Sequence, residues 1–453
     1  MTKPDFGVGG WAGAVLCITF AWCAAAIAAE PAPAADKHLG VASCAGSTCH
    51  GAVRPFADSP IRQDEYFIWQ RKDFHTRAYA TLLTPRSDAI TRRLGLGRAR
   101  DAQECLVCHA ENTPAPQRGE RYQVSDGIGC EACHGASEHW IGPHVAGYKS
   151  NPERVAAGLY PTWDPMARGR LCAACHVGDD AHAMSHAIMA AGHPPLLFEL
   201  DTFTTLEPPH WHVDAAYVAR KGSQDPAHDW VAGQVEGSRV ILRNLAGPRL
   251  AGGVFPELAL FDCNACHHSL KAGRGRPQRS GGLPPGAVPL ADAHLVMLMR
   301  WLDVADPALG AQWRAGWSTL HASTLHDPAA IRQQAQAMLA LLDDRVAARA
   351  RQAELSDRQL RDLLRGVVSD ARGDHAGDFS DAEHTAMAVS VLTTALSQRG
   401  TQQVSAALRM AVDRLYAEVH DRDRFQPESY RVSVENVALA LGLAQLPPKP
   451  AAD

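Results

Sequence analysis

Ten cysteines of this chain fall into five pairs, and a histidine directly follows the second cysteine of each pair. The five sets are Cys44, Cys49 and His50; Cys105, Cys108 and His109; Cys130, Cys133 and His134; Cys172, Cys175 and His176; and Cys263, Cys266 and His267. In C-x-x-C-H the two thiols add to the vinyl groups of a haem as thioethers, and the histidine becomes an axial iron ligand. The spacing therefore predicts five covalently bound haem c groups. The first set has four residues between its cysteines instead of two, which makes a wider loop around the same chemistry.

Zinc sites and disulfides are the two other uses of paired cysteines. Zinc ligands also occur as C-x-x-C, and an exported chain with ten cysteines could form five disulfides. Neither alternative accounts for the histidine that follows every pair. We therefore favour haem attachment at all five sets.

The N-terminus has the features of an export signal. Residues 7–29 carry no charge, follow Lys3 and end in a run of small residues. This pattern predicts a signal peptide over residues 1–29, cleaved near Ala29, and a periplasmic protein. Cleavage removes Cys17 and Cys23, so every remaining cysteine belongs to a haem motif. An uncleaved membrane anchor is the alternative, because the apolar run is nearly long enough to span a bilayer.

Charge and hydropathy restrict the partners of the mature chain. The formal net charge of -5 argues against nucleic acid, which requires a basic surface. No second apolar stretch reaches membrane-spanning length, so we expect a soluble protein after cleavage. The expected partners are redox proteins that donate and accept electrons, with association with a membrane or extracellular cytochrome complex as a further expectation.

The motifs divide the chain into two regions. All five motifs and 16 of the 22 histidines lie between His38 and His268, and the last third contains no cysteine. We predict a pentahaem domain over residues 30–268, a Gly- and Pro-rich linker over 269–286 and a helical domain over 287–446. The expected fold class is mainly α: a haem-packed domain with little regular secondary structure, followed by an α-helical bundle.

Helix-boundary signals place about five or six helices in the C-terminal region. Asp327-Pro328 and a following apolar stripe predict a helix over about 328–350. Ser356 with Gln359 and Ser380 with Glu383 are capping-box pairs, and Gly400 stands where a C-terminal cap belongs.

The second axial ligand of each iron decides its chemistry. An iron held by two imidazoles passes electrons, whereas an iron with an open position can bind a substrate or gas. The pentahaem region contains eleven histidines outside the motifs. They are His38, His75, His139, His144, His182, His186, His193, His210, His212, His228 and His268.

Part of this pattern resembles a known family. The first motif, the segment W-Q-R-K-D-F-H-T-R-A-Y-A-T-L after it, C-L-V-C-H, D-G-I-G-C-E-A-C-H-G and C-A-A-C-H follow one another over roughly residues 38–180. This order is similar to the tetrahaem cytochrome c family typified by the electron acceptor of hydroxylamine oxidoreductase in ammonia oxidisers. The resemblance implies distal ligands at His75 and His144, and an iron without a protein distal ligand at His109. The wider first motif, the fifth haem and the helical domain depart from the family pattern.

The segment from Ser185 to Trp211 is expected to serve the fifth haem. Pro194-Pro195 fixes the backbone after His193, so His193 is the preferred distal ligand there and His210 is the next. His294 lies on an apolar stripe and is expected to be a buried core residue.

The sequence therefore predicts an exported pentahaem cytochrome that relays electrons between periplasmic redox partners through closely packed haems, mostly with two histidine ligands. The alternative is a multihaem oxidoreductase that acts on a small nitrogen or sulfur compound at an open haem. A third interpretation is a structural subunit of a larger respiratory or extracellular cytochrome assembly. We favour electron transfer over catalysis, because no general acid for an open haem can be identified.

Overall fold

The computed structural model describes residues 36–443 except 58, 60, 148–149, 252–255, 268–282, 285–286, 353 and 373–378. The predicted signal peptide over 1–29, His268 and nearly all of the predicted linker lie outside the described residues. What the sequence indicates for these residues stays a prediction.

The protein is mainly α-helical, as the sequence predicts. Within the described ranges the only β-type pairings are two isolated bridges, His38 with Arg118 and Phe261 with Leu290. In that same part of the chain, no helix has the length and apolar character needed to cross a membrane.

The first four haem motifs lie among short helices. These are α1 (Glu65–Lys72), α2 (Ala78–Thr81), α3 (Pro85–Arg93), α4 (Gln103–His109), α5 (Cys130–His134), α6 (Ile141–Ala146), α7 (Asn151–Ala156) and α8 (Pro165–Ala173), followed by the π-helix Ala174–Gly178. Local capping fixes where several of them start: Thr84 caps α3 and Asp164 caps α8, each followed by a first-turn proline. Helices this short depend on tertiary contacts for stability.

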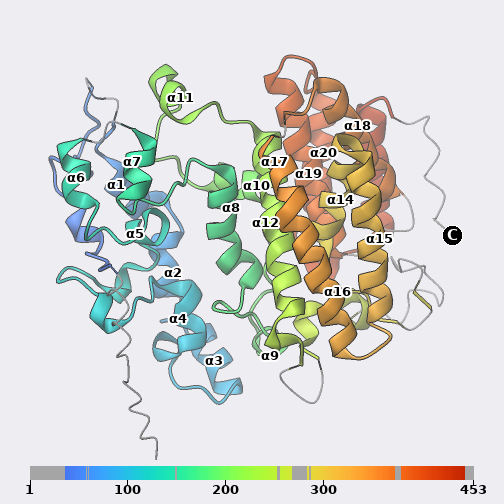
Figure 1. The fold of residues 1–453 in the computed structure, drawn as a ribbon, viewed down its shortest axis with the longest axis horizontal. Helices are drawn as coiled ribbons and strands as arrows, with labels where there is room; N and C mark the ends of the chain where they lie inside the picture. The colour runs from blue at the N-terminus through green and yellow to red at the C-terminus, as the bar shows by residue number, and fades with distance from the viewer. Residues whose placement is uncertain are drawn as a thin grey trace, which may run out of the picture. The chain divides into compact units, whose positions relative to one another are not determined.

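A long helix, α12 (Pro226–Ala246), lies between these short helices and the C-terminal ones (Figure 1). The chain reaches α12 through α9 (His186–Ala190), α10 (Leu200–Leu206) and α11 (Ala215–Lys221). α12 packs against α8 and α10, and also against α14 (Ala293–Ala305), α16 (Pro328–Leu341) and α19 (Phe379–Gln398). Because it has neighbours on several sides, α12 is buried around most of its circumference, including Trp230 and Glu236.

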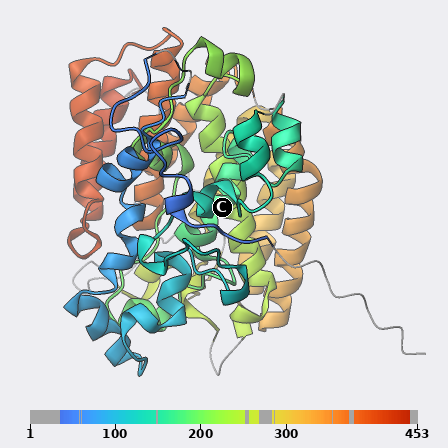
Figure 2. The same ribbon diagram turned by 90° about the vertical axis from the view of Figure 1, so that its left-hand side faces the viewer.

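The C-terminal helices stand beside one another, as the turned view also shows (Figure 2). They are α14 (Ala293–Ala305), α15 (Pro307–Ser323), α16 (Pro328–Leu341), α17 (Ala347–Arg351), α18 (Asp357–Arg372), α19 (Phe379–Gln398), α20 (Ala406–Glu418) and α21 (Pro427–Ala440). A π-helical turn, Leu342–Val346, joins α16 to α17. Because α16, this turn and α17 form one continuous helix, the described part of this region contains seven helices. The sequence predicts five or six.

Most boundary signals in this region are confirmed. The helix expected over about 328–350 is the continuous helix from α16 to α17. Ser356 and Gln359 form the predicted capping box, in which the Gln359 N–H donates to Ser356 Oγ and the Ser356 N–H donates to Gln359 Oε1. Gly400, with φ of 70°, ends α19 as predicted. The Ser380 cap is wrong: α19 already includes Phe379, so Ser380 lies inside the helix.

The described residues from Asp36 to Leu443 form one compact unit. The fifth motif lies on α13 (Cys263–Cys266), and the backbone next to it is tied to the start of the C-terminal region. The Ala291 N–H donates to Leu260 O at 3.0 Å, and the Asp262 N–H donates to Pro289 O at 2.9 Å. The division into domains over 30–268 and 287–446 stays a prediction.

Two glycines of α12 allow neighbouring segments to approach its backbone. A Cβ on Gly233 would stand 2.6 Å from Leu200 Cβ, and a Cβ on Gly237 would stand 2.5 Å from His294 Nδ1. Neither distance leaves room for a methyl group. His294 is 4% exposed and contacts Gln234 and His384, so it is the buried core histidine that its apolar stripe predicts.

We predict that Gly237→Ala destabilises the haem-loaded protein by about 1–3 kcal/mol, because the added methyl overpacks the α12–α14 contact. Gly366→Ala is the control, since Gly366 lies in α18 with no atom within 4 Å of the added Cβ. That variant should be more stable by up to about 1 kcal/mol, owing to the better helix propensity of alanine. Denaturant unfolding compares the two, and a Gly237→Ala protein as stable as the wild type would contradict the close approach.

Candidate metal centres

The haem motifs occupy short helical or turn segments that bring each histidine close to its first cysteine. In the fifth motif the His267 N–H donates to Cys263 O at 2.7 Å. In the wider first motif the His50 N–H donates to Cys44 O at 3.1 Å, and a turn at Gly46 takes up the two extra residues. The wider spacing therefore closes on the same backbone contact.

Each of the five proximal histidines faces a second histidine from a distant part of the chain. The ring-centroid distances are 6.0 Å for His50 and His144, 6.1 Å for His176 and His75, 6.2 Å for His109 and His193, 6.3 Å for His134 and His210, and 6.2 Å for His267 and His186. The angle between the ring planes varies from 22° to 88°, so the shared feature is the separation and not stacking.

This separation fits an iron between two imidazoles. An imidazole nitrogen binds a first-row metal at about 2 Å, so two imidazoles on opposite sides of one iron have ring centroids about 6 Å apart. Aromatic rings in direct contact also have centroid distances of about 4.5–7 Å. Ordinary ring packing, however, does not explain why every motif histidine has a histidine as its partner. Five matched pairs therefore fit haem iron.

The outer nitrogens of several rings are held by hydrogen bonds. Nδ1 of His50 donates to Glu65 at 3.0 Å, and Nδ1 of His75 donates to Asp73 at 3.0 Å. Nδ1 of His109 lies 3.0 Å from Ala78 O, and Nδ1 of His193 lies 2.6 Å from Pro194 O. A bond at Nδ1 orients the ring and leaves Nε2 to bind the metal, which is the usual arrangement of metal-bound histidine.

Burial and neighbouring charges set the protonation of these rings. Burial lowers the pKa of His134 to about 3 and the pKa of His176 to about 4. Both imidazoles are therefore neutral at pH 7, the form that binds a metal. The hydrogen bond that Glu65 accepts raises the pKa of His50, and the one that Asp73 accepts raises the pKa of His75. These carboxylates therefore increase the electron density of the two rings.

The structure brings four predicted distal residues against proximal rings: His75, His144, His193 and His210. The positions of two of them differ from the sequence-based expectations. His193 and His210 are the first and second choices for the fifth haem, but they face His109 of the second motif and His134 of the third motif. The second motif, for which the resemblance implies an open iron, therefore has a histidine opposite its proximal ligand.

His186 is the distal candidate that the sequence analysis did not select, and it faces His267 of the fifth motif. Ser185 caps α9 directly before it, which is the one local signal of a fixed position. Other histidines of the region contact polar groups: His38 bonds to Glu111, His182 Nδ1 lies 2.8 Å from Asp179, and His212 lies 2.6 Å from an Arg62 nitrogen.

No disulfide joins the ten motif cysteines. Two pairs of motifs lie close together: the Cys44 side chain is a neighbour of Cys130, and the Cys108 side chain is a neighbour of Cys175. The first and third motifs are therefore neighbours, and so are the second and fourth. Burial raises the pKa of the Cys133 thiol, with smaller contributions from Glu207 and from Cys172 of the fourth motif.

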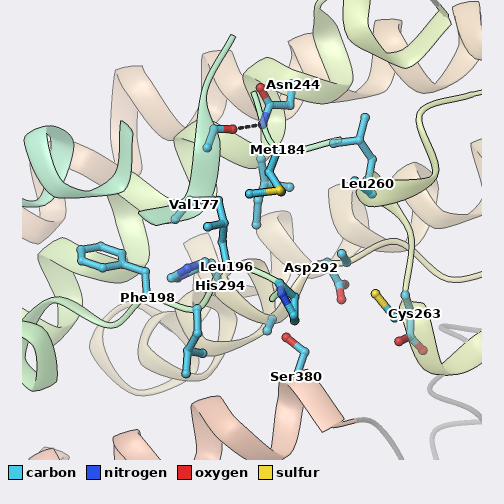
Figure 3. Close-up of a pocket in the computed structure, with 18 of the residues that line it drawn as sticks. Val177, Met184, Leu196, Phe198, Asn244, Leu260, Cys263, Asp292, His294 and Ser380 are labelled. Carbon is cyan, nitrogen blue, oxygen red and sulfur yellow. Dashed lines mark hydrogen bonds between the residues drawn. The ribbon is translucent and has the colours of Figure 1, made fainter. Parts of the chain in front are cut away.

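A cavity connects the fourth and fifth motifs. It has a volume of about 150 Å³, and both His176 and Cys263 line it. Figure 3 shows Cys263 at one side of this cavity and Phe198 at the other, with His294 and Ser380 between them. The C-terminal helices α14 and α19 thus form part of the wall beside the fifth motif.

Residues 40–135, which contain the first three motifs, match the family model described as cytochrome c554 and c-prime. No curated protein and no solved structure matches the chain. The matched segment supports a multihaem c-type cytochrome with covalently bound haem that takes part in electron transfer.

Proposed function

We propose that this protein is an exported pentahaem c-type cytochrome that relays electrons between periplasmic redox proteins. Five haems are bound through Cys44 and Cys49, Cys105 and Cys108, Cys130 and Cys133, Cys172 and Cys175, and Cys263 and Cys266. When bound, each haem supplies an iron that cycles between two oxidation states.

The observation that carries the proposal is the pairing of every proximal histidine with a second histidine about 6 Å away. Two imidazoles fill both axial positions of an iron and leave none for a substrate. Such a site can pass an electron without breaking or making a bond, and rigidly held ligands keep the rearrangement small.

Contacts between motifs support a continuous path. Because Cys44 lies beside Cys130, haems attached at the first and third motifs would be neighbours. Cys108 lies beside Cys175, so the same would hold for haems attached at the second and fourth motifs. Cys133 lies near enough to Cys172 for their charges to interact, so the third and fourth motifs are also neighbours. The cavity from His176 to Cys263 extends the series to the fifth haem, so the fourth haem has three neighbours.

The alternative function, oxidoreduction of a small nitrogen or sulfur compound, requires an open iron. The resemblance implies such an iron at His109, and the ring of His193 faces this residue with a centroid distance of 6.2 Å. The geometry therefore favours relay over catalysis.

Export and the C-terminal region complete the proposal. The uncharged, alanine-rich segment over residues 7–29 supports export, and haem is attached to c-type chains outside the cytoplasm. Helices α14 and α19 contribute His294, Ser380 and His384 to the cavity beside the fifth motif. We infer that the C-terminal helices cover this haem.

We predict that His186→Ala converts one haem from low spin to high spin without loss of haem, because the thioethers and His267 remain. His182→Ala is the matched control: His182 lies in the same segment, but its Nδ1 bonds to Asp179. It should leave all haems low spin. Magnetic circular dichroism measures the spin states, and a low-spin His186→Ala protein would remove His186 from the ligands.

Relay and catalysis are separated by the fate of the reduced protein. We expect the fully reduced protein to be reoxidised by electron-accepting redox proteins, and to show no steady turnover of hydroxylamine, nitrite or a sulfur oxyanion. Stopped-flow absorbance follows both reactions. Sustained turnover of any of these compounds by the purified wild type would overturn the proposed function.

A further inference from the structure

One short helix carries distal histidines at both of its ends. α9 begins with His186, which faces His267 of the fifth motif, and His193 follows shortly after its end, facing His109 of the second motif. The backbone N–H of His186 donates to Glu257 at 2.8 Å, which fixes the first end. α9 therefore connects the ligand sets of two different haems.

The second end of α9 closes in a Schellman-type turn. The Gly192 N–H donates to Met189 O at 2.9 Å, and the His193 N–H donates to Ile188 O at 3.3 Å. Gly192 has a φ of 116°, a backbone conformation that residues other than glycine rarely adopt. The direction in which His193 leaves the helix is set by this turn.

Two arginines of α3 hold the same turn from outside. Arg93 donates to Ala191 O at 2.6 Å, and Arg86 donates to Gly192 O at 3.0 Å. Arg86 and Arg93 are seven positions apart and therefore lie on one face of α3. The two carbonyl oxygens that accept these hydrogen bonds belong to the residues directly before His193. The arginines therefore hold the backbone that carries this ligand.

We propose that Arg86 and Arg93 are positioning residues that hold His193 on the iron of the second haem, and so keep that haem in electron transfer and closed to external ligands. The inference rests on the proposed function, because it assumes that His109 and His193 share one iron. α9 is a single turn of helix and has little stability of its own. Hydrogen bonds from charged donors are stronger than neutral ones, which suits them to hold this turn.

The test is Arg86→Ala/Arg93→Ala in the full-length, haem-loaded protein. We expect one of five haems to become high spin when oxidised and to bind carbon monoxide when reduced, with all five haems still attached. Arg92→Ala is the control, because Arg92 is an exposed arginine on the same helix without a contact to the turn. It should match the wild type. If the double variant misfolds, Arg93→Ala alone should show the same change in part of the molecules.

Combination with ligand variants identifies the haem. Adding His193→Ala to the double arginine variant should produce no further high-spin haem, whereas adding His186→Ala should produce a second one. A double arginine variant that stays low spin, or an equal effect of Arg92→Ala, would overturn the positioning role. A wild type that already contains a high-spin haem would instead contradict the proposed function.

Discussion

An iron held by two imidazoles requires two histidine rings to face each other with centroids about 6 Å apart, one on each side of a porphyrin. One ring of each pair is fixed by its motif, but the second must come from elsewhere in the chain. In this protein the second rings lie far from their partners in sequence, as His144 does from His50 and His75 from His176. The chain between them has to fold back repeatedly, which fits its short, individually capped helices. Porphyrins would fill the space that side chains fill in an ordinary core.

The longer helices anchor the haem motifs, which the short helices cannot do alone. α12 is buried along most of its length and packs on α8, which carries Cys172, and on the C-terminal helices. Its glycines let α10 and His294 of α14 approach closely. The fourth motif is therefore anchored to the most extensively packed part of the protein, and the cavity toward the fifth motif opens beside it. This arrangement explains how a region without any cysteine can contribute to the haem environment.

The sequence predicts the local features of these sites well. Proximal histidines follow from motif spacing, and helix ends follow from residues such as Asp327, Gln359 and Gly400, because these signals act within a few residues. Pairing is a tertiary property, so His193 could be recognised as a distal candidate but not assigned to its haem. The open iron expected at His109 rests on a resemblance that covers the chain only to about residue 180. His193 lies beyond that segment. No proline and no family pattern marks His186, so the sequence does not distinguish it from the other candidate histidines.

The most direct test of this account is the number of low-spin haems in the oxidised wild-type protein, measured by magnetic circular dichroism on a sample whose covalent haems are counted by mass spectrometry. The account predicts five haems, all low spin, because every proximal histidine faces a second one. Four haems, or five with one in the high-spin state, would contradict it.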